Sequence, residues 1–150
     1  MKSNLIISYD EYIIKFKSLI KSMGLNNSIQ REYVLKILFE SDAHLSAELI
    51  LKKVKEKFKV SIGIATVYRV INLLEEMKII NSISLDGSDS KVYELNLVSH
   101  HDHLVCIKCN KIVEFLDETI EQLQKDIAAS HNFKIQSHNM ILYGICKECS

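Results

Sequence analysis

His100-His101-Asp102-His103-Leu104-Val105-Cys106-Ile107-Lys108-Cys109 concentrates three imidazoles, a carboxylate and two thiols in one short stretch. A second Cys-x-x-Cys pair, Cys146 and Cys149, follows it. Two intervening residues let both thiolates of a pair point at one ion, and two such pairs complete the tetrahedral sulfur set that structural Zn2+ prefers. We therefore predict a structural zinc site that organises the C-terminal third of the chain, with ligands Cys106, Cys109, Cys146 and Cys149.

Disulfides and redox chemistry are the two alternatives to zinc. Each pair could form a disulfide, but the adjacent histidines and carboxylates and the repetition of the motif favour a metal. A thioredoxin-like dithiol needs a βαβ context around the motif, which the sequence lacks, and it does not account for a second pair.

Composition bounds the size and the compartment of the protein. With 150 residues, 47% hydrophobic and 25% charged, the chain suits one ordinary domain or two small ones. Residues 1–99 carry 14 Lys+Arg against 12 Asp+Glu (+2), and residues 100–150 carry 5 against 7 (−2), an asymmetry too small to indicate DNA binding by itself. No apolar stretch approaches the roughly 18 residues that span a bilayer, and a signal-peptide core is missing. We expect a cytoplasmic protein with no membrane partner.

Apolar residues at helical spacing predict three helices in the first half of the chain. The first covers residues 10–23 and ends at Gly24, and Ser28 and Ser46 are expected to cap the second and the third. The apolar residues of the first helix are Ile13, Phe16, Leu19, Ile20 and Met23. Those expected to be buried in the next two are Val34, Leu35, Ile37 and Leu38, and then Leu49, Ile50 and Val54.

A fourth predicted helix runs from near Gly63 to about Met77 and has two distinct faces. The face expected to be buried contains Ile64, Val67, Val70, Ile71 and Leu74. The other face combines a small residue, a phenol, a guanidinium and an amide, which suits a DNA major groove because such groups contact base edges and phosphates. Its residues are Ala65, Tyr68, Arg69 and Asn72.

Strands predicted over residues 79–85 and 91–95, around the turn-rich residues 86–90, form a hairpin. Three helices followed by a hairpin define a winged helix, a helix-turn-helix variant. A generic small helical domain with an exposed tyrosine and arginine fits the same pattern, and the residues alone leave both interpretations open.

The sequence of the C-terminal part predicts a small α/β unit. Strands are predicted at 104–107, 111–115 and 140–145, with a helix capped by Asp117 that carries Ile120, Leu123, Gln124 and Ile127. A sheet edge of this unit is expected to pair with a second copy of the chain. The predicted class is therefore α+β, with a winged-helix DNA-binding domain (1–95), a hinge (96–99) and a zinc-stabilised dimerisation domain (100–150).

Several short motifs together resemble the ferric uptake regulator (Fur) family of metal-sensing bacterial repressors, from about residue 15 to residue 149. Ser28 stands where threonine is commoner in the family, and it keeps the capping hydroxyl. The motifs are both cysteine pairs, Ser28-Ile29-Gln30-Arg31, Ala65-Thr66-Val67-Tyr68-Arg69, Tyr93-Glu94, His100-His101-Asp102-His103 and Glu114-Phe115.

The resemblance implies further metal sites and a DNA-contact set. Without the resemblance, His44 would be interpreted as a surface or helix-terminal histidine. Glu94 and Glu114 would be solvated strand ends, and His138 a core or edge histidine. The implied regulatory site contains His44, Glu94, His101, His103 and Glu114, and a third site contains His100, Asp102, Glu121 and His138. The implied DNA contacts are Lys21, Gln30, Arg31, Ala65, Thr66, Tyr68, Arg69 and Asn72.

These sites lead to a functional expectation. A nitrogen and oxygen shell of five ligands suits Fe2+, with Mn2+ or Zn2+ able to substitute. We expect a homodimeric repressor that binds double-stranded operator DNA in response to ferrous iron and controls iron-uptake genes. The peroxide-sensing branch has aspartates where Glu94 and Glu114 stand, and zinc sensors usually recruit a further cysteine. A manganese or nickel sensor stays open.

An enzyme is the competing functional class. A zinc hydrolase or deaminase would carry a His-Glu-x-x-His or His-x-Glu signature, and the sequence has neither. A metal buffer would use the same ligands but would leave Tyr68 and Arg69 unexplained. We therefore expect no enzymatic activity and no small-molecule substrate.

Overall fold

The computed structural model describes residues 7–85, 89–97 and 100–150, so the predicted turn at 86–90 and hinge at 96–99 lie partly outside the described residues. The described residues form two compact units. The first contains residues 7–84 and 89–97, and the second contains residues 100–150 together with Leu85. The domain limits given above stay a prediction.

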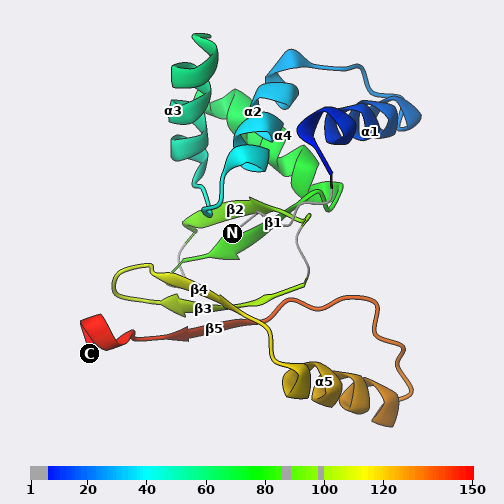
Figure 1. The fold of residues 1–150 in the computed structure, drawn as a ribbon, viewed down its shortest axis with the longest axis vertical. Helices are drawn as coiled ribbons and strands as arrows, with labels where there is room; N and C mark the ends of the chain where they lie inside the picture. Colours follow the sequence, from blue (N-terminus) through cyan, green and yellow to red (C-terminus); the bar gives the residue numbers. More distant parts are fainter. Residues whose placement is uncertain (1–6, 86–88, 98–99) are drawn as a thin grey trace. The chain divides into compact units, whose positions relative to one another are not determined.

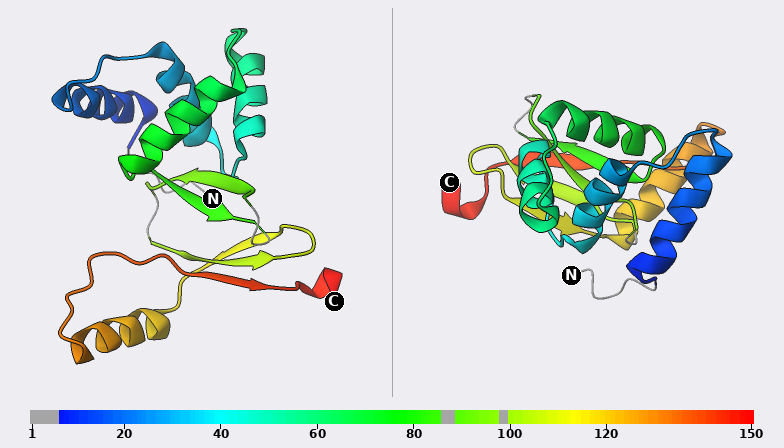
Figure 2. Two further views of the ribbon diagram at one scale, coloured as in Figure 1. Left: turned by 180° about the vertical axis from the view of Figure 1, so that it is seen from behind. Right: turned by 90° about the horizontal axis from the view of Figure 1, so that it is seen from above.

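The first unit has four helices on one side of a two-stranded antiparallel sheet (Figures 1 and 2). This is the winged helix expected from the sequence, with α4 in the position of the recognition helix. Its elements are α1 (Tyr9–Ser22), α2 (Ile29–Glu40), α3 (Ala47–Phe58), α4 (Ile64–Glu76), β1 (Ile80–Ser84) and β2 (Lys91–Leu95).

Side-chain caps mark the starts of two of these four helices, α1 and α3. Ser8 and Glu11 form a capping box at the start of α1, and Gly24, at φ 73°, follows its end. Ser46 accepts a hydrogen bond from the Leu49 backbone N–H at 3.2 Å, as predicted. Ser28 was expected to do the same for α2; it is the N-cap residue, but its side chain makes no capping hydrogen bond.

The core of the first unit lies between the four helices α1–α4 and the sheet. Each buried aliphatic side chain contributes roughly 1.5–3 kcal/mol relative to leaving it exposed. The largest fully buried side chains here include Ile20, Leu35, Leu38, Leu45, Ile50, Ile71, Leu74 and Ile80.

Four residues expected to face this core are instead substantially exposed. Leu49 precedes the buried Ile50 and therefore lies about 100° around the helix from it, off the buried stripe. Ile64 shares a face with Val67 but is the first residue of α4, at the margin of the core. The four are Leu19 (43% exposed), Met23 (50%), Leu49 (38%) and Ile64 (37%).

The second unit is a three-stranded sheet with one helix and a C-terminal 3-10 turn. Its strand order is β4-β3-β5, with β3 antiparallel to β4 and parallel to β5. Asp117 caps α5 by accepting hydrogen bonds from two backbone N–H groups, as predicted. The elements are β3 (Asp102–Cys106), β4 (Ile112–Phe115), α5 (Glu118–Ser130), β5 (Ile141–Gly144) and η1 (Lys147–Cys149).

The strand predicted at 104–107 begins two residues earlier than expected. Asp102 pairs with Phe115 of β4, and His103 pairs with Glu114 of β4 and Ile141 of β5. Both Asp102 and His103 are buried. Pairing on both sides thus extends β3 into the histidine-rich stretch and fixes the direction of its side chains.

A large apolar surface of the second unit is solvent-exposed. All residues of α5 are described, and none of them is buried, although the helix is amphipathic. In Figures 1 and 2 the helix stands away from the sheet, to which an irregular segment returns the chain. The large exposed side chains are Leu104, Ile107, Val113, Leu116, Leu123, Ile127, Phe133, Ile135, Leu142, Tyr143 and Ile145. None of the helices in the described ranges is long and apolar enough to cross a membrane.

Candidate metal centres and nucleic-acid interface

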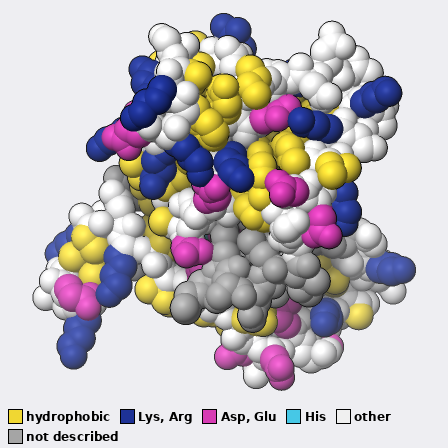
Figure 3. Space-filling model, turned by 45° about the horizontal axis from the view of Figure 1, so that its top comes forward, with side chains coloured by type: hydrophobic (Ala, Val, Ile, Leu, Met, Phe, Trp, Pro, Cys, Tyr) yellow, Lys and Arg dark blue, Asp and Glu magenta, His cyan; other side chains and the backbone are white. Residues whose placement is uncertain are grey.

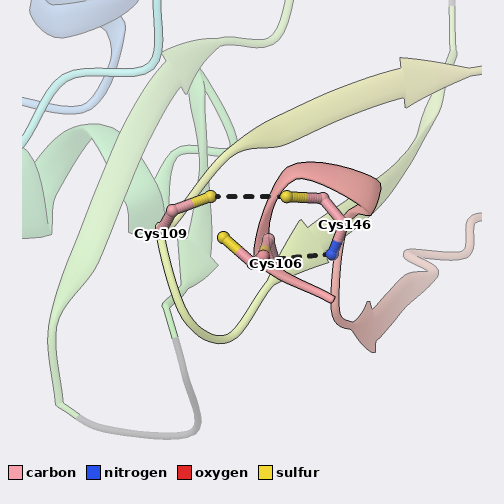
Figure 4. A group of neighbouring side chains, drawn as sticks. Cys106, Cys109 and Cys146 are labelled. Atoms are coloured by element: carbon pink, nitrogen blue, oxygen red, sulfur yellow. Dashed lines mark hydrogen bonds between the residues drawn. The ribbon is translucent and has the colours of Figure 1, made fainter.

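The four cysteines come together at one end of the second unit. Cys106 ends β3, Cys109 lies in the turn before β4, and Cys146 and Cys149 follow β5. All four are free thiols, and their sulfur atoms lie within 4.8 Å of one another. Figure 4 shows the sulfur atoms of Cys106, Cys109 and Cys146 turned toward a common centre. The Cys109–Cys146 Sγ separation of 3.7 Å matches the spacing of about 3.8 Å that a tetrahedral Zn–S length of about 2.3 Å requires.

Local hydrogen bonds shift the pKa values of two of these thiols in opposite directions. Backbone N–H groups, first that of Cys146 at 3.4 Å, lower the pKa of Cys106 to about 6, so this thiol ionises readily. The carboxylate of Glu148 accepts from the thiol of Cys146 and raises the pKa of that thiol to about 12. A metal ion must displace such protons, which couples its affinity to pH. The donor set fits structural zinc.

A second cluster lies in the same unit and contains two histidines and two carboxylates. One potential ligand atom from each residue lies within 4.8 Å of those of the other three. The four residues are His100, Asp102, Glu121 and His138. His100 Nε2 lies 3.4 Å from Asp102 Oδ1, and His138 Nε2 lies 3.3 Å from Glu121 Oε1. The structure therefore brings together all four residues of the predicted third site.

Buried polar atoms show that this cluster suits a cation. Both oxygens of Asp102, Oε1 of Glu121 and Nε2 of His138 are buried without a hydrogen-bond partner among the described residues. An unsatisfied buried polar group costs about 1–3 kcal/mol, and more when it is charged. One ion bound between the two imidazoles and two carboxylates would satisfy these atoms together.

The predicted regulatory residues fall into two sets, one in each unit. In the first unit, His44 Nε2 lies 3.1 Å from Glu94 Oε2. The neighbouring residues Leu45 and Tyr93 exchange two backbone hydrogen bonds, of 3.0 and 2.8 Å. This isolated bridge fastens the segment before α3 to β2 and holds the imidazole beside the carboxylate.

In the second unit, the other three regulatory residues converge on the β3–β4 ladder. His103 lies directly opposite Glu114, and His101 Nε2 lies 3.9 Å from Glu114 Oε1. The rings of His101 and His103 are 4.8 Å apart, centroid to centroid. The first unit thus offers one nitrogen and one carboxylate donor, and the second offers two nitrogen donors and one carboxylate.

The face of α4 predicted to contact DNA is solvent-exposed. Ala65, Tyr68, Arg69 and Asn72 are all exposed, whereas Thr66 is half-buried. Opposite them, α4 buries Val67, Val70, Ile71 and Leu74. The two-faced helix predicted from the sequence is therefore present, apart from Ile64.

The remaining predicted DNA contacts lie around the connection between α1 and α2. Lys21 is exposed in the last turn of α1, and Gln30 is exposed in the first turn of α2. Arg31 is half-buried, and its Nη1 donates to the backbone oxygen of Asn26 at 2.6 Å. Figure 3 shows basic side chains spread over the helical unit and interleaved with acidic and apolar ones. On that face, attraction to phosphates depends on individual residues rather than on a uniform basic surface.

Two features of the first unit were missed by sequence reasoning. The Leu45–Tyr93 bridge has no local signal, because its partners are 48 residues apart. Glu48 accepts a hydrogen bond from the hydroxyl of Tyr68 at 3.2 Å, across two helices. An acidic residue in the first turn of a helix is common, so only the packing of α3 against α4 reveals this contact.

The fold and these sites define a class: a winged-helix protein whose second, α/β unit carries clustered thiol, imidazole and carboxylate ligands. The chain belongs to the Ferric uptake regulator family, whose model matches residues 22–143. It is 45% identical over 145 residues to the ferric uptake regulation protein of Campylobacter upsaliensis, covering 96% of this chain and 92% of that protein.

Solved structures agree with this assignment. The Helicobacter pylori ferric uptake regulator, described with three functional metal-binding sites, matches with a TM-score of 0.85 at 35% identity, over 97% of this chain and 96% of that chain. The Francisella tularensis ferric uptake regulator, solved with iron, matches with a TM-score of 0.72 at 39% identity, over 84% and 95% of the two chains. The resemblance and the α+β winged-helix class are confirmed.

Proposed function

We propose that this chain is a transcriptional regulator that binds operator DNA as a homodimer when ferrous iron is available. The observation that carries the proposal is the exposed Ala65, Tyr68, Arg69 and Asn72 face of α4, in a family member whose second unit gathers metal ligands. Side chains of these types suit the edges of base pairs in a major groove. Repression of iron-uptake genes is the biological role we infer.

In the proposed switch, one ion joins the two sets of regulatory ligands. His44 and Glu94 supply two donors, and His101, His103 and Glu114 supply three. Five nitrogen and oxygen donors suit Fe2+ or Mn2+ better than a closed sulfur set does. An ion bound by ligands of both units favours one orientation of the winged-helix unit. DNA binding then avoids the free-energy cost of ordering that unit.

The metals of the other two sites differ in role. Cys106, Cys109, Cys146 and Cys149 would hold zinc, which supplies folding free energy rather than a signal. The cluster of His100, Asp102, Glu121 and His138 would hold a third ion whose ligands join β3, α5 and the segment before β5. Iron is our first choice for the regulatory site because Glu94 and Glu114 stand where peroxide sensors carry aspartates.

The exposed apolar surface of the second unit supports a homodimer. A monomer rarely exposes so many large apolar side chains on one small unit, and a second copy would cover α5 and the sheet edges. Two winged helices in one dimer can engage successive major-groove half-sites. We propose operator DNA and a second copy as the partners, a cytoplasmic location and no enzymatic activity, since the family consists of regulators.

Operator binding with and without metal tests the function. DNA sites are first selected from a randomised library by the metal-loaded protein, and affinity is then measured by mobility shift without oxygen. For protein carrying only its zinc, added Fe2+ should raise operator affinity at least about tenfold, which corresponds to roughly 1.4 kcal/mol of coupling. Equal affinity with and without Fe2+ or Mn2+ would remove the switch.

Histidine variants separate the regulatory site from general effects of mutation. His101→Ala should keep its zinc content and thermal stability but lose most of the metal response, because one of the five ligands is gone. His131→Ala is the matched control, since His131 ends α5 in an exposed position outside the three ligand sets. A full metal response in His101→Ala would show that the ion binds elsewhere.

A further inference from the structure

The hydroxyl of Tyr68 is already engaged within the protein. Tyr68 lies on the exposed face of α4, and its hydroxyl donates to Glu48 Oε1 at 3.2 Å. Glu48 lies in the first turn of α3, 20 residues earlier in the chain. The contact therefore joins the proposed recognition helix to the helix that precedes it.

Near neutral pH, Tyr68 is the donor of this hydrogen bond and Glu48 is the acceptor. The pKa of Glu48 lies below its ordinary value, chiefly because a backbone N–H at the helix start donates to its carboxylate. The pKa of Tyr68 lies above its ordinary value, because of partial desolvation and then of the nearby carboxylate. Glu48 is thus an anionic acceptor and Tyr68 a protonated donor.

The acceptor is attached to a well-anchored segment. Ser46 caps α3 through the Leu49 N–H, and the Leu45–Tyr93 bridge fastens the preceding residue to β2. A group held by such secondary contacts can fix the orientation of its partner more tightly than a free surface side chain can. The tyrosine side chain is therefore restrained before any ligand arrives.

A tyrosine on a DNA-facing helix can contact DNA in two ways. Its hydroxyl can donate to a phosphate oxygen, or its ring can pack against the methyl group of a thymine. Here the hydroxyl donates to Glu48, and a carboxylate beside it repels a phosphate at that position. The ring remains as the part of Tyr68 available to a base.

We propose that Glu48 is a positioning residue for DNA recognition, which holds the hydroxyl of Tyr68 so that the tyrosine ring meets a thymine methyl group. The inference rests on the proposed function, since it needs α4 to face the operator. Glu48 then favours thymine at one operator position without touching a base. Its negative charge also weakens binding to DNA of unrelated sequence.

Replacing single operator thymines by deoxyuridine tests this directly, because the change removes only the methyl group. For the wild-type protein, one such replacement in one half-site should lower affinity roughly fourfold, the effect of about one buried methyl group. In Glu48→Ala and in Tyr68→Phe, which break the same hydrogen bond, the loss should fall below about twofold. Glu48→Gln keeps an acceptor oxygen and should retain most of the methyl effect.

Two controls isolate the positioning role. Glu56→Ala removes the same charge from an exposed position of α3 and should keep the full deoxyuridine effect. The double variant Glu48→Ala/Tyr68→Phe should discriminate thymine from deoxyuridine as well as either single variant does, since the two residues act as one unit. Thermal unfolding of each variant verifies that the fold is intact.

The outcomes separate this inference from the proposed function. If wild-type protein binds its operator in response to metal but Glu48→Ala keeps the fourfold methyl effect, Glu48 has no positioning role. The inference would also be wrong if the effects of Glu48→Ala and Tyr68→Phe multiplied in the double variant. It would be wrong as well if no operator thymine could be found whose replacement by deoxyuridine lowers affinity. Absence of metal-dependent operator binding by the wild type would instead refute the function on which it rests.

Discussion

At the residue scale, chemistry that depends on short spacing was predictable and chemistry that depends on packing was not. The two Cys-x-x-Cys pairs predicted a four-sulfur cluster, and the structure places the four sulfur atoms within 4.8 Å. Their role as zinc ligands stays a prediction. The contact between Glu48 and Tyr68 had no such signal, because it depends on how two helices pack.

Removal of one thiol tests the zinc site. Cys109→Ser should lose zinc and lower the free energy of unfolding by several kcal/mol, because binding of a structural ion contributes folding free energy. Zinc content by atomic absorption and thermal unfolding would measure both effects. Chelator-treated wild type should unfold at nearly the same temperature as the variant; a variant that keeps its zinc and its stability would contradict the four-sulfur assignment.

An isosteric change tests the third site. Asp102→Asn keeps the shape of a buried side chain but removes its charge, so we expect one fewer bound ion per protomer with the zinc content unchanged. The rise in melting temperature on adding metal should shrink accordingly. Glu118→Gln, in the exposed first turn of α5, is the charge-matched control and should bind metal as the wild type does.

At the element scale, hydrophobic periodicity and capping predicted the α-helices and strands of the described residues, and the predicted ends differ from the observed ones by at most two residues. The short 3-10 helix η1 was not predicted. The errors lie at the margin of the core: Leu49 lies off the buried stripe of α3, and Ile64 lies at the first residue of α4, where the core ends. The early start of β3 follows from pairing with β4 and β5. Such pairing depends on residues far along the chain and leaves no local pattern.

The two capping serines give a paired prediction about helix stability. Ser46→Ala should lower the free energy of unfolding by about 1 kcal/mol, because its hydroxyl accepts from the Leu49 N–H. Ser28→Ala should cost clearly less, since the side chain of Ser28 makes no capping hydrogen bond. Urea unfolding of both variants measures the difference. Equal losses would mean that the hydroxyl of Ser28 caps α2 in solution.

At the scale of the whole molecule, assembly is argued from the apolar surface of the second unit. The amphipathic helix α5 has no fully buried residue within the isolated unit, whereas a second copy would give its apolar face a partner. The sequence indicated an assembling α/β unit, but not which side chains it exposes. His44 and His101 are also far apart along the chain. The regulatory site could therefore be predicted only from the resemblance to the family.

A charge on α5 tests this surface. Ile127 is 62% exposed, so Ile127→Glu should leave the protomer folded while a buried carboxylate disfavours the dimer. Sedimentation equilibrium should report monomers at concentrations where the wild type is dimeric. Lys125→Glu places the same side chain at another exposed position of the helix, with a larger change of charge, and should remain dimeric. Retention of the dimer by Ile127→Glu would place the interface elsewhere.

Because β3 and β5 run parallel, their carboxyl ends lie side by side, and the cysteines at those ends would fasten the last strand through one ion. β5 is short and occupies an edge of the sheet. Without that fastening it can detach and leave the backbone of β3 open to foreign strands. Metal starvation severe enough to strip zinc would therefore expose the protein to irreversible aggregation.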